Sequence, residues 1–202
     1  MNLKLRQKIE RTITFLPAGE QPPPPIAYWA TRPYHERLVE VFIIVSGGRE
    51  TYMELIEDIL EMLLLLNQHQ VRFLVVGGYA LGLHGHPRYT KDFDIWVERS
   101  ETNLSRFHTA LAAFGIELDA EGQNKFLAGH HFWLGKPPWT IGFIGHPTGI
   151  EFETCYATRE ESELEGVTIP FLSQEHFIAN KLAMGRPQDL ADVDHLRRLQ
   201  GD

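Results

Sequence analysis

The chain has 202 residues, of which 43% are hydrophobic and 23% charged, and these values are typical of a soluble globular protein with one sizeable core. A single cysteine, Cys155, excludes an internal disulfide framework, the apolar run at 62–66 is far too short for a membrane span, and the N-terminus lacks a secretory signal pattern. We therefore expect a cytoplasmic protein without a membrane partner, whose net charge of −8 disfavours long polyanions unless a basic patch compensates locally.

The first quarter of the chain differs from the rest in composition. Prolines cluster at 22–25, which is typical of a polyproline-type or disordered linker. A helix is predicted over 53–70, because leucine and isoleucine recur at helical spacing and acidic residues load its first half. We expect a Pro-rich, loosely ordered extension over 1–52 and one domain over 53–202.

The stretch after this helix carries the candidate chemistry. Residues 71–76 are apolar and predict a buried strand, which Gly77 and Gly78 end. A glycine has no Cβ, so its backbone can turn left-handed and let a phosphate approach the amide groups. Residues 79–83 then predict a brief helix whose N-terminal N–H groups would face that phosphate.

An Asp-x-Asp pair follows at Asp92 and Asp94. The apolar run 95–97 comes directly after it and predicts a second strand beside the first. Side chains two residues apart on a strand share a face, so both carboxylates are expected to point the same way. Such a pair can bridge two hard cations roughly 4 Å apart, which stabilise the attacking and leaving oxygens of nucleotidyl transfer. The pair therefore predicts a site for two Mg²⁺ ions, or Mn²⁺.

Later elements follow from periodicity and from Gly, Pro and capping residues. We expect a helix at 100–114, a weakly patterned segment at 116–135, strands at 140–144 and 150–156, a solvated helix or loop at 157–166, an edge strand at 167–172, and final helices that begin at Ser173 and near Pro187.

Histidines and the lone cysteine are given no chemical role. His130 and His131 are adjacent, so they point to different sides of most local structures. No further ligand follows them at the spacing of a zinc site, so a zinc site is not expected here. The same holds for His84 and His86. Cys155 is expected to be buried and inert.

The stretch around the Asp pair resembles the signature of the DNA-polymerase-beta-like nucleotidyltransferase superfamily, which is a strand, a glycine pair, a short helix and an Asp-x-Asp pair. It is similar to a branch of small bacterial stand-alone members, the nucleotidyltransferases of abortive-infection and toxin–antitoxin systems. The matching residues are Gly77-Gly78-Tyr79-Ala80-Leu81, His84-Gly85, Pro87-Arg88 and Thr90-Lys91-Asp92-Phe93-Asp94.

The resemblance implies an α/β (α+β) nucleotidyltransferase fold with a small mixed sheet, helices mainly on one face and a C-terminal helical pair. It also implies a third acidic residue on a strand near the pair. Relatives usually carry Asp where this chain has Glu151, and Glu153 is the alternative. Asp92, Asp94 and Glu151 would thus be the catalytic and metal-binding residues, and Glu151 would help to deprotonate the acceptor.

The resemblance further implies the nucleotide-binding residues. They are Gly77, Gly78, Arg88, Thr90, Lys91, Lys181 and Asp189. Lys181 would face the phosphates from a C-terminal helix, and Asp189 would support the site. The alternative for this region is a buried Arg–Asp network, with Arg186 bound to Asp192, that only locks the two helices.

The expected reaction is metal-dependent transfer of a nucleoside monophosphate from a nucleoside triphosphate to an acceptor hydroxyl, with release of pyrophosphate. The acceptor could be transfer RNA, a protein or a small cationic molecule, and a cognate antitoxin-type protein is a further expected partner. The alternative is a catalytically inactive binding module or toxin–antitoxin partner with the same fold.

Overall fold

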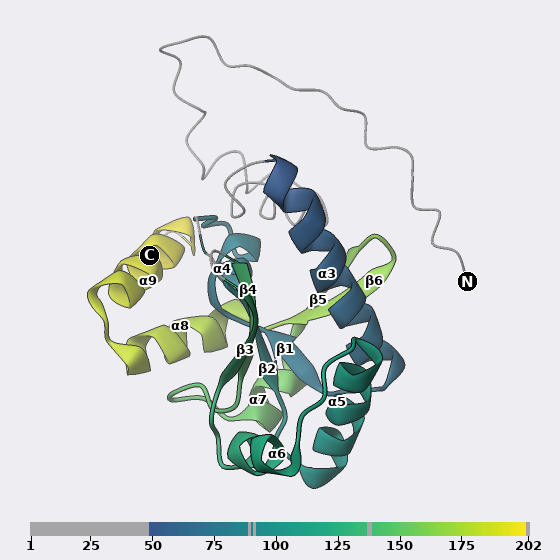
Figure 1. Cartoon of the computed structure of the whole chain (residues 1–202). Helices are drawn as coiled ribbons and strands as arrows, with labels where there is room; N and C mark the ends of the chain where they lie inside the picture. The colour runs from purple at the N-terminus through teal and green to yellow at the C-terminus, as the bar shows by residue number, and fades with distance from the viewer. Residues whose placement is uncertain (1–48, 89, 91, 137–138, 201–202) are drawn as a thin grey trace.

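The computed structural model describes residues 49–88, 90, 92–136 and 139–200 (Figure 1). Within these residues the helices are α3 (Arg49–Gln68), α4 (Gly77–Leu83), α5 (Glu101–Ala113), α6 (Ala120–Leu127), α7 (Phe152–Ala157), α8 (Gln174–Met184) and α9 (Pro187–Gln200). The strands are β1 (Phe73–Val75), β2 (Asp92–Val97), β3 (Phe132–Lys136), β4 (Trp139–Ile144), β5 (Glu160–Leu164) and β6 (Val167–Phe171). Nearly all of the expected N-terminal extension, and Lys91, lie outside the described residues.

The strands form one mixed sheet of six in the order β3-β4-β2-β1-β6-β5. β1 pairs antiparallel with β2 and parallel with β6, and β2 pairs parallel with β4. Two antiparallel hairpins, β3–β4 and β5–β6, complete the two edges. The expected α/β class with a small mixed sheet and a C-terminal helical pair is confirmed.

Helices cover both faces of the sheet, so the expectation that they lie mainly on one face was wrong. On one face, Phe107 of α5 packs 4.9 Å from Phe143 of β4, measured between ring centroids. On the other face, Phe152 of α7 meets Trp96 of β2 edge to face at 5.0 Å. In Figure 1, α3 and α5 lie to one side of the strands and α8 and α9 to the other. The Asp pair lies on the same face as Trp96, because Asp92, Asp94 and Trp96 are every second residue of β2.

The strand expected over 150–156 was wrong, because helix α7 begins at Phe152 and residues 150 and 151 are in neither a helix nor a strand. Their pattern fits both periods, since Phe152, Cys155 and Tyr156 also recur at the spacing of one helix face. The helix buries Cys155 completely and stacks the Phe152 and Tyr156 rings at 5.4 Å, so tertiary burial decides the period. Burial also raises the pKa of the Cys155 thiol to about 11, as expected for an inert cysteine.

Two other segments differ from expectation. Residues 157–166 contain strand β5, which is the edge strand, so β6 is not an edge. The pairing of β6 with β1 is limited to the register pair Val75↔Phe171, so most of β6 is paired on one side only, which suits its Pro170. The weakly patterned segment 116–135 forms α6 and most of β3.

Helix ends near the candidate site follow from local sequence. Ser173 is the N-cap residue of α8, although its hydroxyl contacts His176 Nδ1 at 2.9 Å and does not cap a backbone N–H, and Gly185 ends that helix in the left-handed region at φ +66°. Pro187 is the first residue of α9, where its missing N–H costs nothing. No helix in the part of the chain that the structure describes is long and apolar enough to span a bilayer.

Candidate functional site

The glycine pair and the Asp pair lie together at one end of the sheet. Because β1 and β2 are antiparallel, the residues that follow β1 meet the residues that begin β2. The Val76 N–H donates to the Asp94 carbonyl at 3.0 Å. Gly77 then starts α4 at φ +66°, and a Cβ at this position would overlap the Asp94 Oδ2 atom. The turn expected to cradle phosphates therefore packs directly on one carboxylate of the pair.

We expect Gly77→Ala to destabilise the fold by about 2 kcal/mol or more and to displace the Asp94 carboxylate, because the new methyl group needs both a left-handed backbone and the space that Oδ2 occupies. Gly166→Ala is a matched control, since Gly166 has φ +78° but nothing within 4 Å of an added Cβ. Urea unfolding of both variants measures the difference. Equal losses would show that the Gly77–Asp94 contact contributes nothing.

The partner of the Asp pair across the sheet is β4. In the parallel register, Asp92 lies opposite Thr140 and Asp94 opposite Gly142. The Thr140 hydroxyl donates to Asp92 Oδ1 at 2.5 Å. Gly142 places no side chain against Asp94, and a Cβ there would lie 2.7 Å from Asp94 Oδ1. The Asp92 carboxylate is thus held by a hydroxyl, while the Asp94 carboxylate packs against a residue without a side chain.

Asp94 is the electrostatically perturbed member of the pair. Burial, followed by the negative charge of Asp92, raises the pKa of Asp94 to about 7, and the positive charge of Lys181 partly opposes this rise. Within the described residues, no hydrogen-bond donor reaches the Asp94 carboxylate. Two half-buried carboxylates on one face, close enough for the charge of one to act on the other, form a donor set that fits a hard divalent cation.

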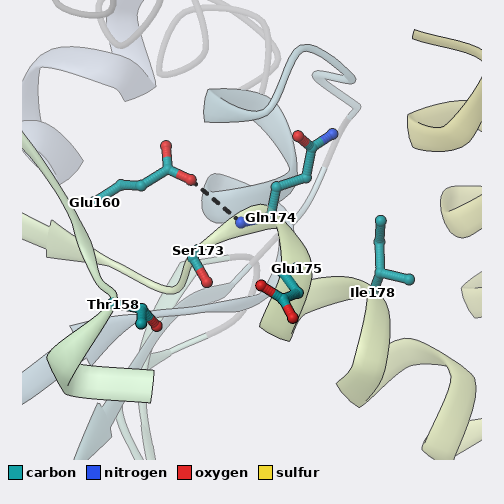
Figure 2. Close-up of a pocket in the computed structure, with 6 residues that line it drawn as sticks. All are labelled: Thr158, Glu160, Ser173, Gln174, Glu175 and Ile178. Atoms are coloured by element: carbon teal, nitrogen blue, oxygen red, sulfur yellow. Dashed lines mark hydrogen bonds between the residues drawn. The ribbon is translucent and has the colours of Figure 1, made fainter. Parts of the chain in front are cut away.

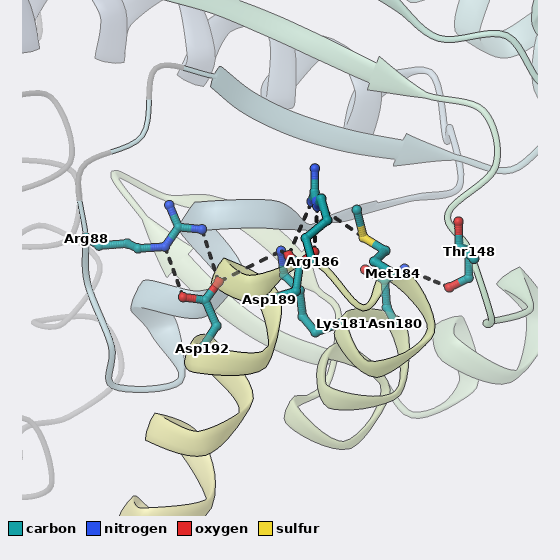
Figure 3. Close-up of polar contacts among 8 residues, drawn as sticks. All are labelled: Arg88, Thr148, Asn180, Lys181, Met184, Arg186, Asp189 and Asp192. Carbon is teal, nitrogen blue, oxygen red and sulfur yellow. Dashed lines mark hydrogen bonds and ion pairs between the residues drawn. The ribbon is translucent and has the colours of Figure 1, made fainter.

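Lys181 reaches this region from α8, where it is buried at the centre of a polar cluster (Figure 3). Its Nζ atom lies 2.7 Å from Asp189 Oδ1 and 3.9 Å from Asp192 Oδ2. Burial alone would raise the pKa of Asp189, but hydrogen bonds from Arg186 and Lys181, together with their charges, lower it to about 2. Asp189 therefore stays ionised and fixes Lys181 on the side of α8 that faces Asp94.

The loop after α4 is tied to α9 in the same cluster. Arg88 donates from Nε and Nη2 to the two carboxylate oxygens of Asp192, at 3.2 and 3.1 Å. Arg186 contacts Asp189 at 2.6 Å, so the expected Arg186–Asp192 pair is replaced by two separate pairs. An Arg–Asp network does lock the helices, as the structural alternative predicted. It also holds Lys181 where its charge acts on Asp94, and it ties Arg88 to the same cluster through Asp192.

Thr90 packs against the glycine turn. A Cβ on Gly78 would lie 2.7 Å from Thr90 Cγ2, so the absence of a side chain at residue 78 is what allows the loop to close over α4. The structure thus brings together Gly77, Gly78, Arg88, Thr90, Asp92, Asp94, Lys181 and Asp189.

Glu151 and Glu153 do not join this group. Glu153 accepts hydrogen bonds from Arg72 at 2.7 and 2.8 Å, and Arg72 precedes β1, at the opposite end of that strand from Gly77. Glu151 is the exposed N-cap residue of α7, and among the described residues the charges that shift the pKa of Asp94 are those of Asp92 and Lys181. The expected placement of Glu151 on a strand beside the pair was wrong, because Glu151 is in no strand and directly precedes α7, while β1 and β4 are the strands that adjoin β2.

The described residues contain no group of three or more His, Cys, Asp or Glu side chains placed to hold a metal ion. The two β4 residues that pair with the Asp pair are Thr140 and Gly142. The Thr140 hydroxyl donates to Asp92, and Gly142 has no side chain that could serve as a ligand. Sequence reasoning missed both residues. A signal was present, since a small residue in a strand often marks a close approach of another group, but the pairing partner of β2 was unknown.

The other histidines near this end of the sheet have structural contacts. His84 is buried and its Nε2 lies 2.8 Å from the Leu172 carbonyl. His86 stacks on His195 of α9, with the ring centroids 3.6 Å apart. The first contact attaches the end of α4 to the chain just after β6, and the second attaches the following turn to α9.

A hollow of about 420 Å³ lies beside the start of α8 (Figure 2). It is lined by Thr158, Glu160, Ser173, Gln174, Glu175 and Ile178. The Gln174 N–H donates to Glu160 Oε1 at 3.2 Å across one wall. None of the predicted site residues lines this hollow, so it is separate from the Asp pair.

The fold and the site define an α/β protein with a paired-carboxylate site at the end of a mixed sheet. No protein-family model and no curated protein matches the chain. One match among solved structures is the crystal structure of an antigenic nucleotidyltransferase-like protein from Paracoccidioides brasiliensis. The TM-score is 0.43 and the identity 16%, over 70% of this chain and 75% of that one. A likeness at this level does not assign the chain to a family.

Proposed function

We propose that the chain is a divalent-cation-dependent nucleotidyltransferase of the DNA-polymerase-beta-like superfamily. It would move a nucleoside monophosphate from a nucleoside triphosphate to an acceptor hydroxyl and release pyrophosphate. The observation that carries this proposal is the contact of Gly77 with Asp94, which sets a phosphate-binding type of turn against a half-buried carboxylate with no protein donor among the described residues.

Asp92 and Asp94 would hold Mg²⁺, or Mn²⁺, together with phosphate oxygens of the substrate. When bound, such an ion neutralises charge on the transferred phosphoryl group. The side chains for this role are already oriented: Thr140 holds Asp92, and the two oxygens of Asp94 pack against Gly77 and Gly142, where side chains are absent.

The cationic side chains would act on the leaving group. The amides at Gly77 and Gly78 would receive the β- and γ-phosphates, and Arg88 and Lys181 would offset the charge that builds on pyrophosphate. Both cations are held by Asp192 and Asp189, so they are positioned before substrate arrives. Thr90 and Lys91 would complete the nucleotide-binding loop.

The test is a transfer assay with each nucleoside triphosphate, labelled either at the α- or at the γ-phosphate, in the presence of Mg²⁺ and a whole-cell extract. We expect label from the α-position on an acceptor and none from the γ-position, because the monophosphate moves and pyrophosphate leaves. Transfer of the γ-label would instead identify a kinase. Separating the extract into RNA, protein and small molecules then identifies the acceptor class.

Glu151→Gln is expected to leave transfer and nucleotide affinity within about two-fold of the wild-type values, because Glu151 is exposed at the start of α7 and apart from the Asp pair. The same transfer assay measures the effect. A loss comparable to that of an Asp92 or Asp94 variant would return Glu151 to the catalytic group.

A second candidate function is nucleotide binding without transfer, as in a binding module or a toxin–antitoxin partner. It is favoured by Gly142, because the strand beside the Asp pair supplies no third carboxylate that could deprotonate an acceptor. Titration of Mg²⁺ and nucleotide would then show cation-dependent affinity in a protein that transfers no label. In this case the binding partner could be a cognate antitoxin-type protein.

A further inference from the structure

Trp133 is the most exposed of the large hydrophobic side chains in the described part of the chain, at 56%. It lies on β3, the edge strand beside β4, and pairs with Gly142 in the antiparallel register. Gly142 in turn pairs with Asp94. Directly paired residues place their side chains on the same face, so Asp94 and Trp133 lie in one row across three strands, roughly 10 Å apart along the sheet.

Gly142 lies between Asp94 and Trp133 in this row and has no side chain to separate them. A Cβ at residue 142 would lie 2.7 Å from Asp94 Oδ1 and 3.1 Å from Trp133 Nε1. The indole edge and the carboxylate therefore border the same small space above β4. The His131 ring lies 6.4 Å from the Trp133 ring, measured between centroids, and more than half of the Trp133 surface stays in solvent beside the half-buried Asp94 carboxylate. An apolar ring with this exposure is unlike a core residue and can contact a ligand.

The position of Trp133 relative to the glycine turn decides which ligand it would contact. Gly77 lies against Oδ2 of Asp94, whereas Gly142 and Trp133 lie on the side of Oδ1. In phosphoryl and nucleotidyl transfer the attacking oxygen and the leaving group are roughly in line on opposite sides of the phosphorus atom. If pyrophosphate leaves toward the glycine turn, the acceptor hydroxyl enters from the Trp133 side.

The surroundings of Trp133 favour an anionic acceptor that carries an aromatic base. A hollow of about 380 Å³ extends from Trp133 over Ala128, Gly129, His130 and His131. Arg99 Nη1 lies 3.2 Å from where a Gly129 Cβ would be, and His146 also adjoins this glycine. Burial, followed by the charges of His146 and His130, lowers the pKa of His131, so Arg99 supplies positive charge to this group and His131 supplies a hydrogen-bonding ring. In an acidic protein, such a group beside an exposed aromatic ring is a combination that single-stranded nucleic acid binds.

We infer that Trp133 is the stacking platform of an acceptor subsite, which binds the terminal nucleobase of a single-stranded nucleic acid and presents its terminal hydroxyl toward Asp94. His130, His131 and Arg99 line the path of the sugar-phosphate backbone leading to this base. The inference rests on the proposed function, because that function places the phosphates at Gly77 and Gly78, and it narrows the acceptor to one chemical class.

The experiment measures fluorescence anisotropy of a short, end-labelled oligoadenylate, as RNA and as DNA, without nucleoside triphosphate. It compares the wild-type chain with Trp133→Ala, Trp133→Phe and the control Leu190→Ala, which removes another exposed apolar side chain from α9. We expect Trp133→Ala to weaken oligonucleotide binding by a factor of about 5 to 100, Trp133→Phe by less than about three, and Leu190→Ala not at all. Affinity for each Mg·NTP, measured by calorimetry, should be the same in all four proteins. An RNA preference would indicate that the ribose 2′-hydroxyl is read.

Several outcomes would overturn the inference. One is equal oligonucleotide affinity in the wild-type chain and Trp133→Ala, and another is no measurable oligonucleotide binding to the wild-type chain. A loss of Mg·NTP affinity in Trp133→Ala would assign the ring to the substrate base. Absence of Mg·NTP binding to the wild-type chain would overturn the proposed function instead. The oligonucleotide affinities are measured without nucleoside triphosphate, so they distinguish that failure from a failure of the Trp133 inference.

Discussion

Replacing Asp94 with Asn is expected to abolish Mg²⁺-dependent nucleotide binding and transfer while making the cation-free protein more stable above neutral pH. The first effect follows because Asn has no charge with which to hold a cation beside Asp92. The second follows because burial and the Asp92 charge raise the pKa of Asp94 from 3.8 to about 7. Between these values the folded chain binds more protons than the unfolded chain, so the free energy of unfolding falls as the pH rises.

The size of the stability effect can be bounded. Each unit of pKa difference corresponds to about 1.4 kcal/mol, so the ionised Asp94 costs the folded state at most about 4 kcal/mol above pH 7, and none of this cost exists well below pH 4. Asp94→Asn should remove that pH dependence.

Urea unfolding without metal at pH 5 and pH 8 measures this pH dependence of the free energy of unfolding. Asp194→Asn is a matched control, because the Asp194 side chain is 68% exposed. Wild-type nucleotide affinity or transfer activity in the Asp94 variant would refute the cation site.

Nucleotide binding should depend on pH for the same reason. A cation competes with the proton on Asp94, so Mg·NTP affinity is expected to rise as the pH increases through about 7 and to level off above it. Calorimetry over this range in buffers of different ionisation enthalpy would also detect the released proton. A flat profile would mean that Asp94 does not ligate the ion.

Replacing Asp189 with Ala is expected to destabilise the protein by about 3 kcal/mol, because it leaves the buried Lys181 ammonium without its nearest carboxylate. Asp192, at 3.9 Å, compensates only in part. The control is Arg186→Ala, which should cost less than about 1 kcal/mol because the Arg186 side chain is 62% exposed. Urea unfolding at pH 7 measures both changes.

Two further results would check this reading of the cluster. Adding Lys181→Met to Asp189→Ala should recover part of the lost stability, since the unpaired charge is then removed. The pKa of Asp189 is lowered to about 2, so its contribution is complete above about pH 4 and should be lost as the pH falls toward 2. If Asp189→Ala and Arg186→Ala cost the same, Lys181 does not depend on Asp189.

Loss of Lys181 alignment should also appear in function. If Asp189 positions Lys181 for the leaving group, Asp189→Asn should lower the transfer rate more than the affinity for Mg·NTP, because the leaving-group charge develops mainly in the transition state. Comparison of kcat with KM distinguishes this role from a purely structural one, which would act through the amount of folded protein.

Elements whose type is set by residues close together in the sequence were predicted correctly. The strand, glycine turn, short helix and Asp-x-Asp pair follow one another within about 25 residues, and periodicity together with glycine chemistry predicts their types. The same is true of α8 and α9, because Ser173, Gly185 and Pro187 are local end signals. The structure extends β2 to include Asp92 and starts α3 four residues before Met53, which are ordinary boundary differences.

Segments whose structure depends on distant contacts were not predicted correctly. Residues 150–156 carry both a strand period and a helix period, and the packing of Phe152 on Trp96 selects the helix. Residues 116–135 have little apolar periodicity, yet Phe126 and Phe132 pack against each other and on Phe107 of α5, which fixes α6 and β3 in place.

The sequence by itself determined that this protein has a glycine turn and two carboxylates on one strand face, because both depend on backbone chemistry over a few residues. Only the tertiary structure decided what surrounds them. The choice of β4 as the parallel neighbour of β2 puts Gly142 and Trp133 beside Asp94 and leaves Glu151 elsewhere. Strand pairing is decided by burial across the whole sheet, and no local pattern specifies it.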